Sequence, residues 1–233
     1  MKRLLLPLIA ALLVLPAWAQ DADTASDPKP GYDTAVLQID FGGRTRVVAI
    51  KLFPDDAPKT VNNFKSHIES GYYKGTVFHR AIADLLVQTG DPLTKESGNR
   101  AEWGTGGNDY TVPAEIKLKH ARGSVAMARL GDASNPNRES SGSQFYFALK
   151  PLEPLDGKYT IFGEVVQGLD VLDAISRVVV DTNDAPVERV EIVSTSLVKD
   201  AGDIPEDEKP KRTKRTVRES DKGAFTKLIE RIW

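Results

Sequence analysis

The feature that most constrains the fold is a succession of short apolar segments, separated by turn signals, between residues 34 and 198. The first two segments, residues 35–41 and 47–53, flank Gly42-Gly43 and therefore predict a β-hairpin. So many short strands with few helices favour a mainly β fold whose antiparallel sheet is closed or sandwiched. The strands expected after the hairpin cover residues 76–79, 85–88, 124–128, 145–149, 160–166 and 187–197.

Two helices are expected among the strands. The first helix begins near Pro58 and ends before Gly71. Proline is tolerated in the first turn of a helix, because an N–H at that position would have no acceptor within the helix. Asp55 or Asp56 is the expected capping residue. The second helix covers residues 169–175. The side chains expected to face the core from the first helix are Val61, Phe64 and Ile68.

Composition divides the chain into a leader, a spacer, a globular domain and a charged tail, expected at residues 1–19, 20–33, 34–198 and 199–233. The leader combines Lys2-Arg3, an apolar run and Ala17-Trp18-Ala19, which together predict a cleaved secretory signal. Its apolar run of about twelve residues is too short to span a bilayer. The spacer is small, acidic and proline-bearing, as flexible linkers are. We therefore expect export and a periplasmic location.

The domain must be held together by its apolar core, because the chain contains no cysteine. Disulfides, thiol nucleophiles and thiolate metal sites are excluded for the same reason. Removing Lys2 and Arg3 with the leader takes the formal charge from −2 to −4, so no nucleic-acid partner is expected. We expect a monomer. The glycine-bearing stretch 92–113 predicts a long surface loop, a kind of loop that often carries function.

The tail changes character twice. An acidic stretch from Asp200 to Glu208 precedes a basic stretch from Lys209 to Arg218, which is typical of a solvated, disordered tail. The last residues instead have the spacing of an amphipathic helix, which would pack on the domain, dock on a partner protein or lie on an anionic membrane surface. The apolar side chains with this spacing are Phe225, Leu228, Ile229, Ile232 and Trp233.

Four short segments spread over about eighty residues carry the chemistry. Together they offer one permanently charged cation, two neutral amides and many apolar side chains, but no nucleophile beside a base. That set suits catalysis of rotation about a bond better than catalysis of bond cleavage. The segments are Phe78-His79-Arg80, Gln88-Thr89-Gly90-Asp91, Gly142-Ser143-Gln144-Phe145 and Leu155-Asp156-Gly157-Lys158.

Over residues 35–198 the chain resembles the cyclophilin family of peptidyl-prolyl isomerases. The resemblance rests on the four segments, and on Ala57-Pro58-Lys59-Thr60, Asn63-Phe64 and Tyr73-Lys74-Gly75. It implies a closed, eight-stranded antiparallel barrel capped by two helices, with a proline site on the outer face. It also implies that the partners are unfolded or extended segments containing proline, and that no cofactor is used.

The resemblance also implies roles for single residues. The family's catalytic arginine falls on Arg80, and its amides fall on Gln88 and Gln144. No metal is expected, because the histidines lack the spacing of metal ligands. His79 and His120 are expected to be packing histidines with satisfied ring nitrogens. The expected substrate-binding residues are Leu85, Leu86, Met127, Ala128, Arg129, Tyr146, Leu155 and Tyr159.

Two departures from the family pattern leave a second function open. Leu85 stands where the family commonly has phenylalanine, and Pro154 where tryptophan is common. Weaker stacking on the proline ring would follow, and with it lower activity and poor binding of cyclosporin-like macrocycles. The favoured function is an isomerase that assists the folding of exported proteins. The alternative is a proline-binding chaperone or scaffold with little turnover.

Overall fold

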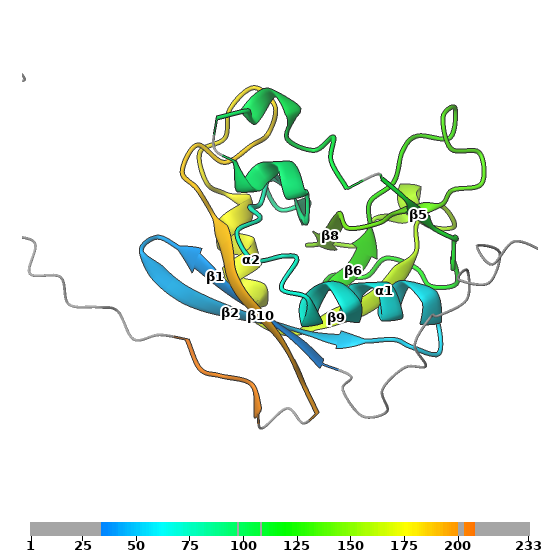
Figure 1. The fold of residues 1–233 in the computed structure, drawn as a ribbon, viewed down its shortest axis with the longest axis horizontal. Helices are drawn as coiled ribbons and strands as arrows, with labels where there is room; N and C mark the ends of the chain where they lie inside the picture. Colours follow the sequence, from blue (N-terminus) through cyan, green and yellow to red (C-terminus); the bar gives the residue numbers. More distant parts are fainter. Residues whose placement is uncertain (1–33, 97, 108, 200–202, 208–233) are drawn as a thin grey trace, which may run out of the picture. The chain divides into compact units, whose positions relative to one another are not determined.

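Eight strands form one antiparallel sheet in the order β10-β1-β2-β9-β6-β8-β4-β3 (Figure 1). The structure is a computed structural model, and it describes residues 34–207 except 97, 108 and 200–202. A mainly β fold with antiparallel pairing is confirmed. The strands of this sheet are β1 (Thr34–Phe41), β2 (Arg44–Leu52), β3 (Arg80–Ile82), β4 (Leu86–Thr89), β6 (Ser124–Met127), β8 (Phe145–Ala148), β9 (Ile161–Gln167) and β10 (Glu191–Val198).

The expected hairpin is β1 and β2, which pair from Phe41↔Arg44 to Thr34↔Lys51. Gly42 and Gly43 connect the two strands with φ values of 62° and 72°, a conformation that glycine adopts without strain. The β1–β2 hairpin therefore follows from the turn residues, as the sequence predicts.

The sheet curls, but continuous strand pairing does not close it, because β10 and β3 are its two outer strands. The strand expected at residues 76–79 does not form, and β3 begins after it. The backbone there bonds to β10 and to the residue before it. Gly75 N donates to Ile192 O at 2.8 Å, and Phe78 N donates to Val190 O at 3.0 Å. Closure of the sheet into a barrel stays a prediction.

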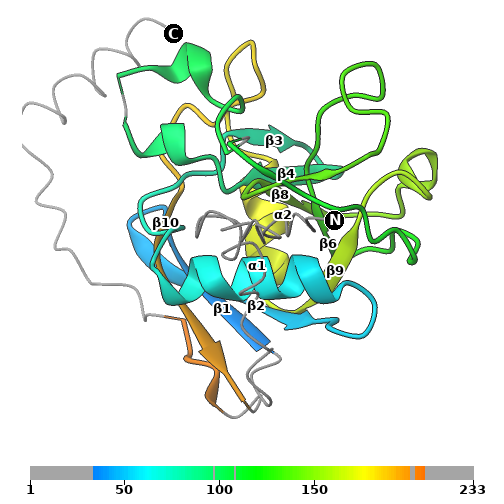
Figure 2. The same cartoon turned by 45° about the vertical axis from the view of Figure 1, so that its right-hand side comes forward.

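Both expected helices form, as α1 (Pro58–Glu69) and α2 (Leu169–Ser176). α1 packs against β10, and α2 packs against β2 and β4 (Figure 2). Val61, Phe64 and Ile68 are buried on α1, as the spacing predicts.

The expected aspartate cap of α1 is wrong. Ala57 occupies the capping position and makes no side-chain hydrogen bond. The free N–H groups of the first turn are satisfied from outside the helix. The Glu115 carboxylate accepts hydrogen bonds from Lys59 N at 3.0 Å and Thr60 N at 2.9 Å. A residue distant in sequence thus does what an N-cap side chain usually does.

The sheet buries apolar side chains on both faces, and β8 shows how. Phe145 and Phe147 point into the main core, where Phe145 packs edge to face on Phe64 of α1. Tyr146 and Ala148 alternate with them and point to the opposite face. There they join a second apolar cluster. Its buried members are Leu86, Ala126, Tyr146, Ala148, Leu152 and Ile161.

The remaining described elements are short. A second sheet pairs β5 (Thr111–Val112) with β7 (Ser140–Ser141), and three 3₁₀ helices cover Pro92–Lys95, Arg100–Glu102 and Glu153–Leu155. The first two of these 3₁₀ helices lie in the expected long loop. None of the helices described has the length and apolar content needed to cross a membrane.

Candidate active site

Sheet register brings three of the expected site residues into one row. Arg80 on β3 is the direct partner of Gln88 on β4, which is the direct partner of Tyr146 on β8. The row continues to Ala126 on β6. Directly paired residues project to the same side of a sheet. Arg80, Gln88 and Tyr146 therefore lie side by side on the face that carries the second apolar cluster.

The Arg80 side chain is 45% exposed, so its charge faces solvent at the edge of the sheet. Its Nε lies 3.7 Å from Oδ2 of Asp184, a half-exposed ion pair. Among the described residues, no hydrogen bond engages the two Nη groups. Within the described part of the chain, the guanidinium is thus held at Nε, and its Nη groups have no partner there.

The two glutamines are bonded to each other. Gln88 Nε2 donates to Gln144 Oε1 at 2.8 Å, and Gln144 Nε2 donates to the carbonyls of Gly104 (2.9 Å) and Gly106 (2.7 Å). Gln144 is almost fully buried. Its amide therefore holds Gln88 and the loop at 104–106, and the expected direct grip of Gln144 on substrate backbone stays a prediction.

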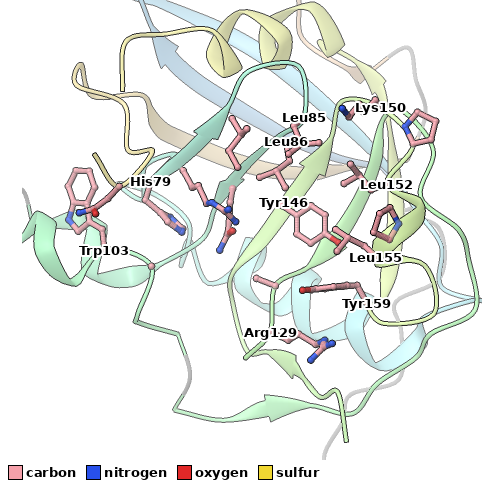
Figure 3. Close-up of a pocket in the computed structure, with 18 residues that line it drawn as sticks. His79, Leu85, Leu86, Trp103, Arg129, Tyr146, Lys150, Leu152, Leu155 and Tyr159 are labelled. Carbon is pink, nitrogen blue, oxygen red and sulfur yellow. The ribbon is translucent and has the colours of Figure 1, made fainter. Parts of the chain in front are cut away.

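A groove of about 770 Å³ runs across this face of the sheet (Figure 3). It brings most of the expected residues together. Gln144 lies in a smaller adjoining hollow of about 70 Å³, which shares Gln88, Gly104 and Arg129 with the groove. The expected residues that line the main groove are Arg80, Leu85, Leu86, Gln88, Ala128, Arg129, Tyr146, Leu155 and Tyr159.

Met127 does not line the groove, and its expected place in the substrate site is wrong. It is 1% exposed and lies in the main core. Met127 pairs with Phe145, whereas Ala126 pairs with Tyr146. Since successive side chains of a strand point to opposite faces, Met127 faces inward while its neighbour faces the groove.

Two tyrosines stand together in one part of the groove wall. Tyr146 and Tyr159 meet edge to face, with 5.8 Å between ring centroids. The Arg129 guanidinium lies over the Tyr159 ring at 4.8 Å and donates to Asp132 at 2.6 Å. The wall thus keeps aromatic surface although Leu85 and Pro154 supply none. Arg129 is only 4% exposed and is a fixed part of this wall.

Trp103 lines the opposite end of the groove, beside His79 (Figure 3). Trp103 was not expected from the sequence, although an aromatic ring in a long glycine-bearing loop is a usable signal. Arg100 stacks on the Trp103 ring at 4.5 Å and donates to Asp181 at 2.9 Å. The other lining residues not expected from sequence are His79, Ile82, Gly104, Lys150, Pro151, Leu152, Pro154 and Asn183.

The two packing histidines differ. The His79 ring nitrogens are buried with no hydrogen bond of ordinary geometry among the described residues, yet the Val77 backbone and the Gln144 side chain lie close enough to act on the pKa of His79, so a satisfied His79 stays a prediction. Burial lowers the pKa of His79, although nearby Asp91 acts in the opposite direction. Both ring nitrogens of His120 are hydrogen-bonded. No group of three or more potential metal ligands gathers anywhere in the described part of the chain.

Comparison with known proteins places the chain beside peptidyl-prolyl isomerases of the cyclophilin type. Residues 36–197 match the family model of the "cyclophilin type peptidyl-prolyl cis-trans isomerase/CLD". Peptidyl-prolyl cis-trans isomerase 10 of Caenorhabditis elegans is 40% identical over 151 residues, which are 64% of this chain and 88% of the relative. Peptidyl-prolyl cis-trans isomerase CYP71 of Arabidopsis thaliana is 37% identical over 153 residues, 65% of this chain but 23% of the relative. The chain spans about a quarter of the length of the first curated relatives it matches.

Solved structures agree with the sequence relatives. A crystal structure of a cyclophilin-type peptidyl-prolyl cis-trans isomerase from Cryptosporidium parvum has a TM-score of 0.62 and 29% identity, covering 72% of this chain and 98% of that one. A second structure of that protein, determined in the presence of the dipeptide Ala-Pro, has a TM-score of 0.61. Fold, groove and sequence therefore agree that this chain belongs to the family of cyclophilin-type peptidyl-prolyl cis-trans isomerases.

Proposed function

We propose that the chain accelerates cis/trans rotation about X–Pro peptide bonds, with Arg80 as its catalytic residue. The observation that carries this proposal is the position of Arg80 at the groove. Its half-exposed guanidinium stands in one row with Gln88 and with Tyr146, which walls an apolar hollow. A cation with free N–H groups beside a hollow for an apolar ring is what this rotation requires.

Catalysis of this rotation requires an interaction that stabilises the twisted X–Pro bond more than the planar one. Resonance between the amide nitrogen and the carbonyl gives the X–Pro bond a barrier of about 18–20 kcal/mol. In the twisted transition state the nitrogen lone pair is localised, so an N–H donor aimed at it binds that state better than the planar one. A charge-assisted hydrogen bond supplies about 1.5–3 kcal/mol. The apolar groove binds the proline ring in the planar and twisted states alike, and so holds the X–Pro bond beside this donor.

The proposed substrate is a proline-containing unfolded or extended segment lying across the groove. Leu86, Tyr146, Leu155 and Tyr159 would enclose the proline ring. Ala128 and Arg129 would flank the chain on either side of it. This assignment is supported by the lining of the groove, and by the crystal structure of the Cryptosporidium parvum isomerase determined in the presence of the dipeptide Ala-Pro.

The test compares turnover of a proline tetrapeptide by the wild type, Arg80→Ala and Arg177→Ala. Arg177 pairs with Asp84 and does not line the groove, so it is a matched control. Loss of one charge-assisted bond should lower kcat by about tenfold to a hundredfold in Arg80→Ala. Circular dichroism checks folding. Equal rates for Arg80→Ala and the wild type would exclude catalysis by Arg80.

The alternative function is a binding module that grips proline segments with little turnover. Leu85 and Pro154 favour it, because both line the groove without an aromatic ring. The same assay separates the two functions. Tight peptide binding with no acceleration in the wild type would support the module and contradict the enzyme.

We also propose that the chain acts on exported proteins in the periplasm. The support is the sequence of residues 1–19, which lie outside the described residues. Mass spectrometry of the protein recovered from a periplasmic fraction would show a new N-terminus at Gln20. An intact N-terminus in the cytoplasm would contradict export.

The tail supports a separate proposal of docking on a membrane surface. Residues 208–233 lie outside the described residues, and the support is the sequence pattern of basic residues beside apolar ones. Co-sedimentation with anionic vesicles should retain the chain and lose a variant truncated after Lys199. Equal recovery of the two proteins would leave docking on a partner protein or a solvated tail.

A further inference from the structure

A buried histidine links two segments of the groove wall. His120 lies in the extended stretch 113–120, and its side chain is 1% exposed. Its Nε2 lies 2.7 Å from the Tyr146 hydroxyl, and its Nδ1 lies 2.9 Å from Asp156 Oδ1. The backbone N–H of His120 donates to the same carboxylate oxygen at 2.8 Å. Three residues far apart in sequence therefore form one continuous hydrogen-bonded chain.

The direction of each hydrogen bond follows from the chemistry of its ends. The backbone N–H of His120 is the main cause that lowers the pKa of Asp156, so this carboxylate is ionised and can only accept. In the neutral imidazole of His120, Nδ1 then carries the proton and Nε2 is the acceptor. Burial raises the pKa of Tyr146, whose neutral hydroxyl donates to Nε2. Both ring nitrogens of His120 and the Tyr146 hydroxyl are satisfied in this arrangement.

The two ends of this hydrogen-bonded chain, Tyr146 and Asp156, belong to segments that form the wall of the groove. Tyr146 comes from β8, while Asp156 lies between Leu155 and Tyr159, which both line the groove. The rings pack together as well. His120 stacks on Tyr146 with ring centroids 6.0 Å apart, and it meets Tyr159 edge to face at 6.3 Å. In the groove, Tyr146 lies between Leu155 and Tyr159 on one side and Leu86 on the other (Figure 3).

We propose that His120 is a positioning residue that assembles the proline pocket, by fixing the Tyr146 ring against the turn that carries Leu155 and Tyr159. This inference rests on the proposed function, because it gives His120 a role in forming one wall of the proposed proline site. His120 lies behind the wall and does not line the groove itself. Loss of the link should therefore loosen the grip on the proline ring in the planar and twisted states alike, which raises KM and leaves kcat nearly unchanged.

Two single variants break the link from opposite ends. Tyr146→Phe keeps the ring and removes only the hydroxyl, so it has little reason to misfold. In His120→Asn, the side-chain amide can replace Nδ1 toward Asp156 but cannot reach Tyr146. His67→Asn is the matched control, because His67 is half-buried and hydrogen-bonded to Gly142 O but does not line the groove.

The measurements are kcat and KM with a proline tetrapeptide, the Kd of the same peptide by NMR titration, and the thermal midpoint. Tyr146→Phe and His120→Asn should each raise KM and Kd about three- to tenfold, with kcat within about twofold of the wild type. The double variant should raise KM and Kd no more than the more strongly affected single variant does, since both substitutions remove the same link. His67→Asn should leave KM and Kd unchanged.

Three results would overturn the inference. Unchanged KM and Kd in Tyr146→Phe, or effects that add in the double variant, would show that the link does not shape the pocket. A fall in kcat at constant KM would place these residues in the rotation step. These outcomes leave the proposed function intact in an active wild type. A wild type that neither binds nor isomerises the peptide would remove the proposed function, and this inference with it.

Discussion

Arg80 is oriented by a carboxylate that lies about a hundred residues further along the chain. Asp184 approaches Arg80 Nε, while the backbone N–H of Ala81 donates to the Asp184 carbonyl at 2.8 Å. Asp184 has a φ of 62°, a left-handed conformation that aspartate and asparagine tolerate better than most residues. The backbone of Asp184 is thus fixed to β3 by a hydrogen bond, beside the ion pair that its side chain makes with Arg80. Its value to Arg80 is orientation, because half-exposed ion pairs add little stability.

Asp184→Asn tests this orientation, and Asp84→Asn is its matched control. Asp84 also has a positive φ (56°) and also pairs with an arginine, but that arginine is Arg177. We expect kcat to fall about two- to fivefold in Asp184→Asn, because the guanidinium loses its fixed plane, and to stay unchanged in Asp84→Asn. Steady-state kinetics of both variants decide the matter. Equal behaviour of the two would show that Asp184 is only a surface charge.

A second prediction at this scale concerns His79 and pH. Burial lowers the pKa of His79 below its ordinary value of 6.5, so the unfolded chain takes up this proton before the folded chain does. The free energy of unfolding should therefore fall as the pH falls below about 6.5. His79→Gln should show a shallower decline in urea titrations at several pH values. His67 has a pKa lowered by burial in the same way, so some decline should remain.

At the scale of elements, the extended stretch 113–120 connects parts that the sheet does not join. Glu115 caps α1, its own N–H donates to Thr160 Oγ1 at 2.9 Å, and His120 closes the stretch at the groove wall. The stretch has no regular secondary structure of its own. Its position depends on these side-chain bonds, and it links the helix to the back of the site.

Removing the Glu115 cap should destabilise the domain without touching the site. Glu115→Ala frees two N–H groups of α1 and should cost about 0.5–2 kcal/mol of unfolding free energy. Glu115→Gln keeps an acceptor and should cost less. Glu188→Gln, at an exposed glutamate, controls for charge. Urea unfolding measures the cost, and the isomerase KM should not change. A neutral Glu115→Ala would show that α1 does not need this cap.

At the scale of the whole domain, main-chain hydrogen bonds bring the two outer strands of the sheet near each other. Phe78 N and Ile192 N donate across the gap, to Val190 O and Thr76 O at 3.0 and 2.9 Å. These bonds join the chain just before β3 to β10 and the residue that precedes it. They make the sheet nearly continuous although β3 itself does not pair with β10.

Hydrogen exchange would show whether this seam belongs to the cooperative sheet. If it does, the amides of Phe78 and Ile192 should exchange only through global unfolding, as slowly as amides of central strands such as Val125 and Phe147. Exchange through a small local opening at Phe78, with Val125 still protected, would show that the sheet ends open at β3. Native-state exchange at increasing urea concentration distinguishes the two cases.

Much of the fold could be read from local patterns, because turn residues and apolar spacing act between near neighbours in the chain. The β1–β2 hairpin and both helices follow from Gly42-Gly43, Pro58 and the spacing of Phe64 and its partners. The strand at 76–79 was misplaced because its hydrogen bonds do not go to a single neighbour: Phe78 N donates to Val190 O, more than a hundred positions away, whereas Val77 N donates to Thr94 Oγ1 and His79 N to Gln88 O. Met127 was misplaced because all four residues of β6 are buried, so no polar alternation marks which face is which.

The sequence by itself determined the family, the β1–β2 hairpin, and the inventory of one arginine and two glutamines. Only the tertiary structure decided how these groups are used. It commits the Gln144 amide to a loop, brings Trp103 to the groove, and places His120 behind Tyr146. The physical reason is that hydrogen bonds and side-chain packing depend on distance in space, and folding sets that distance independently of separation along the chain.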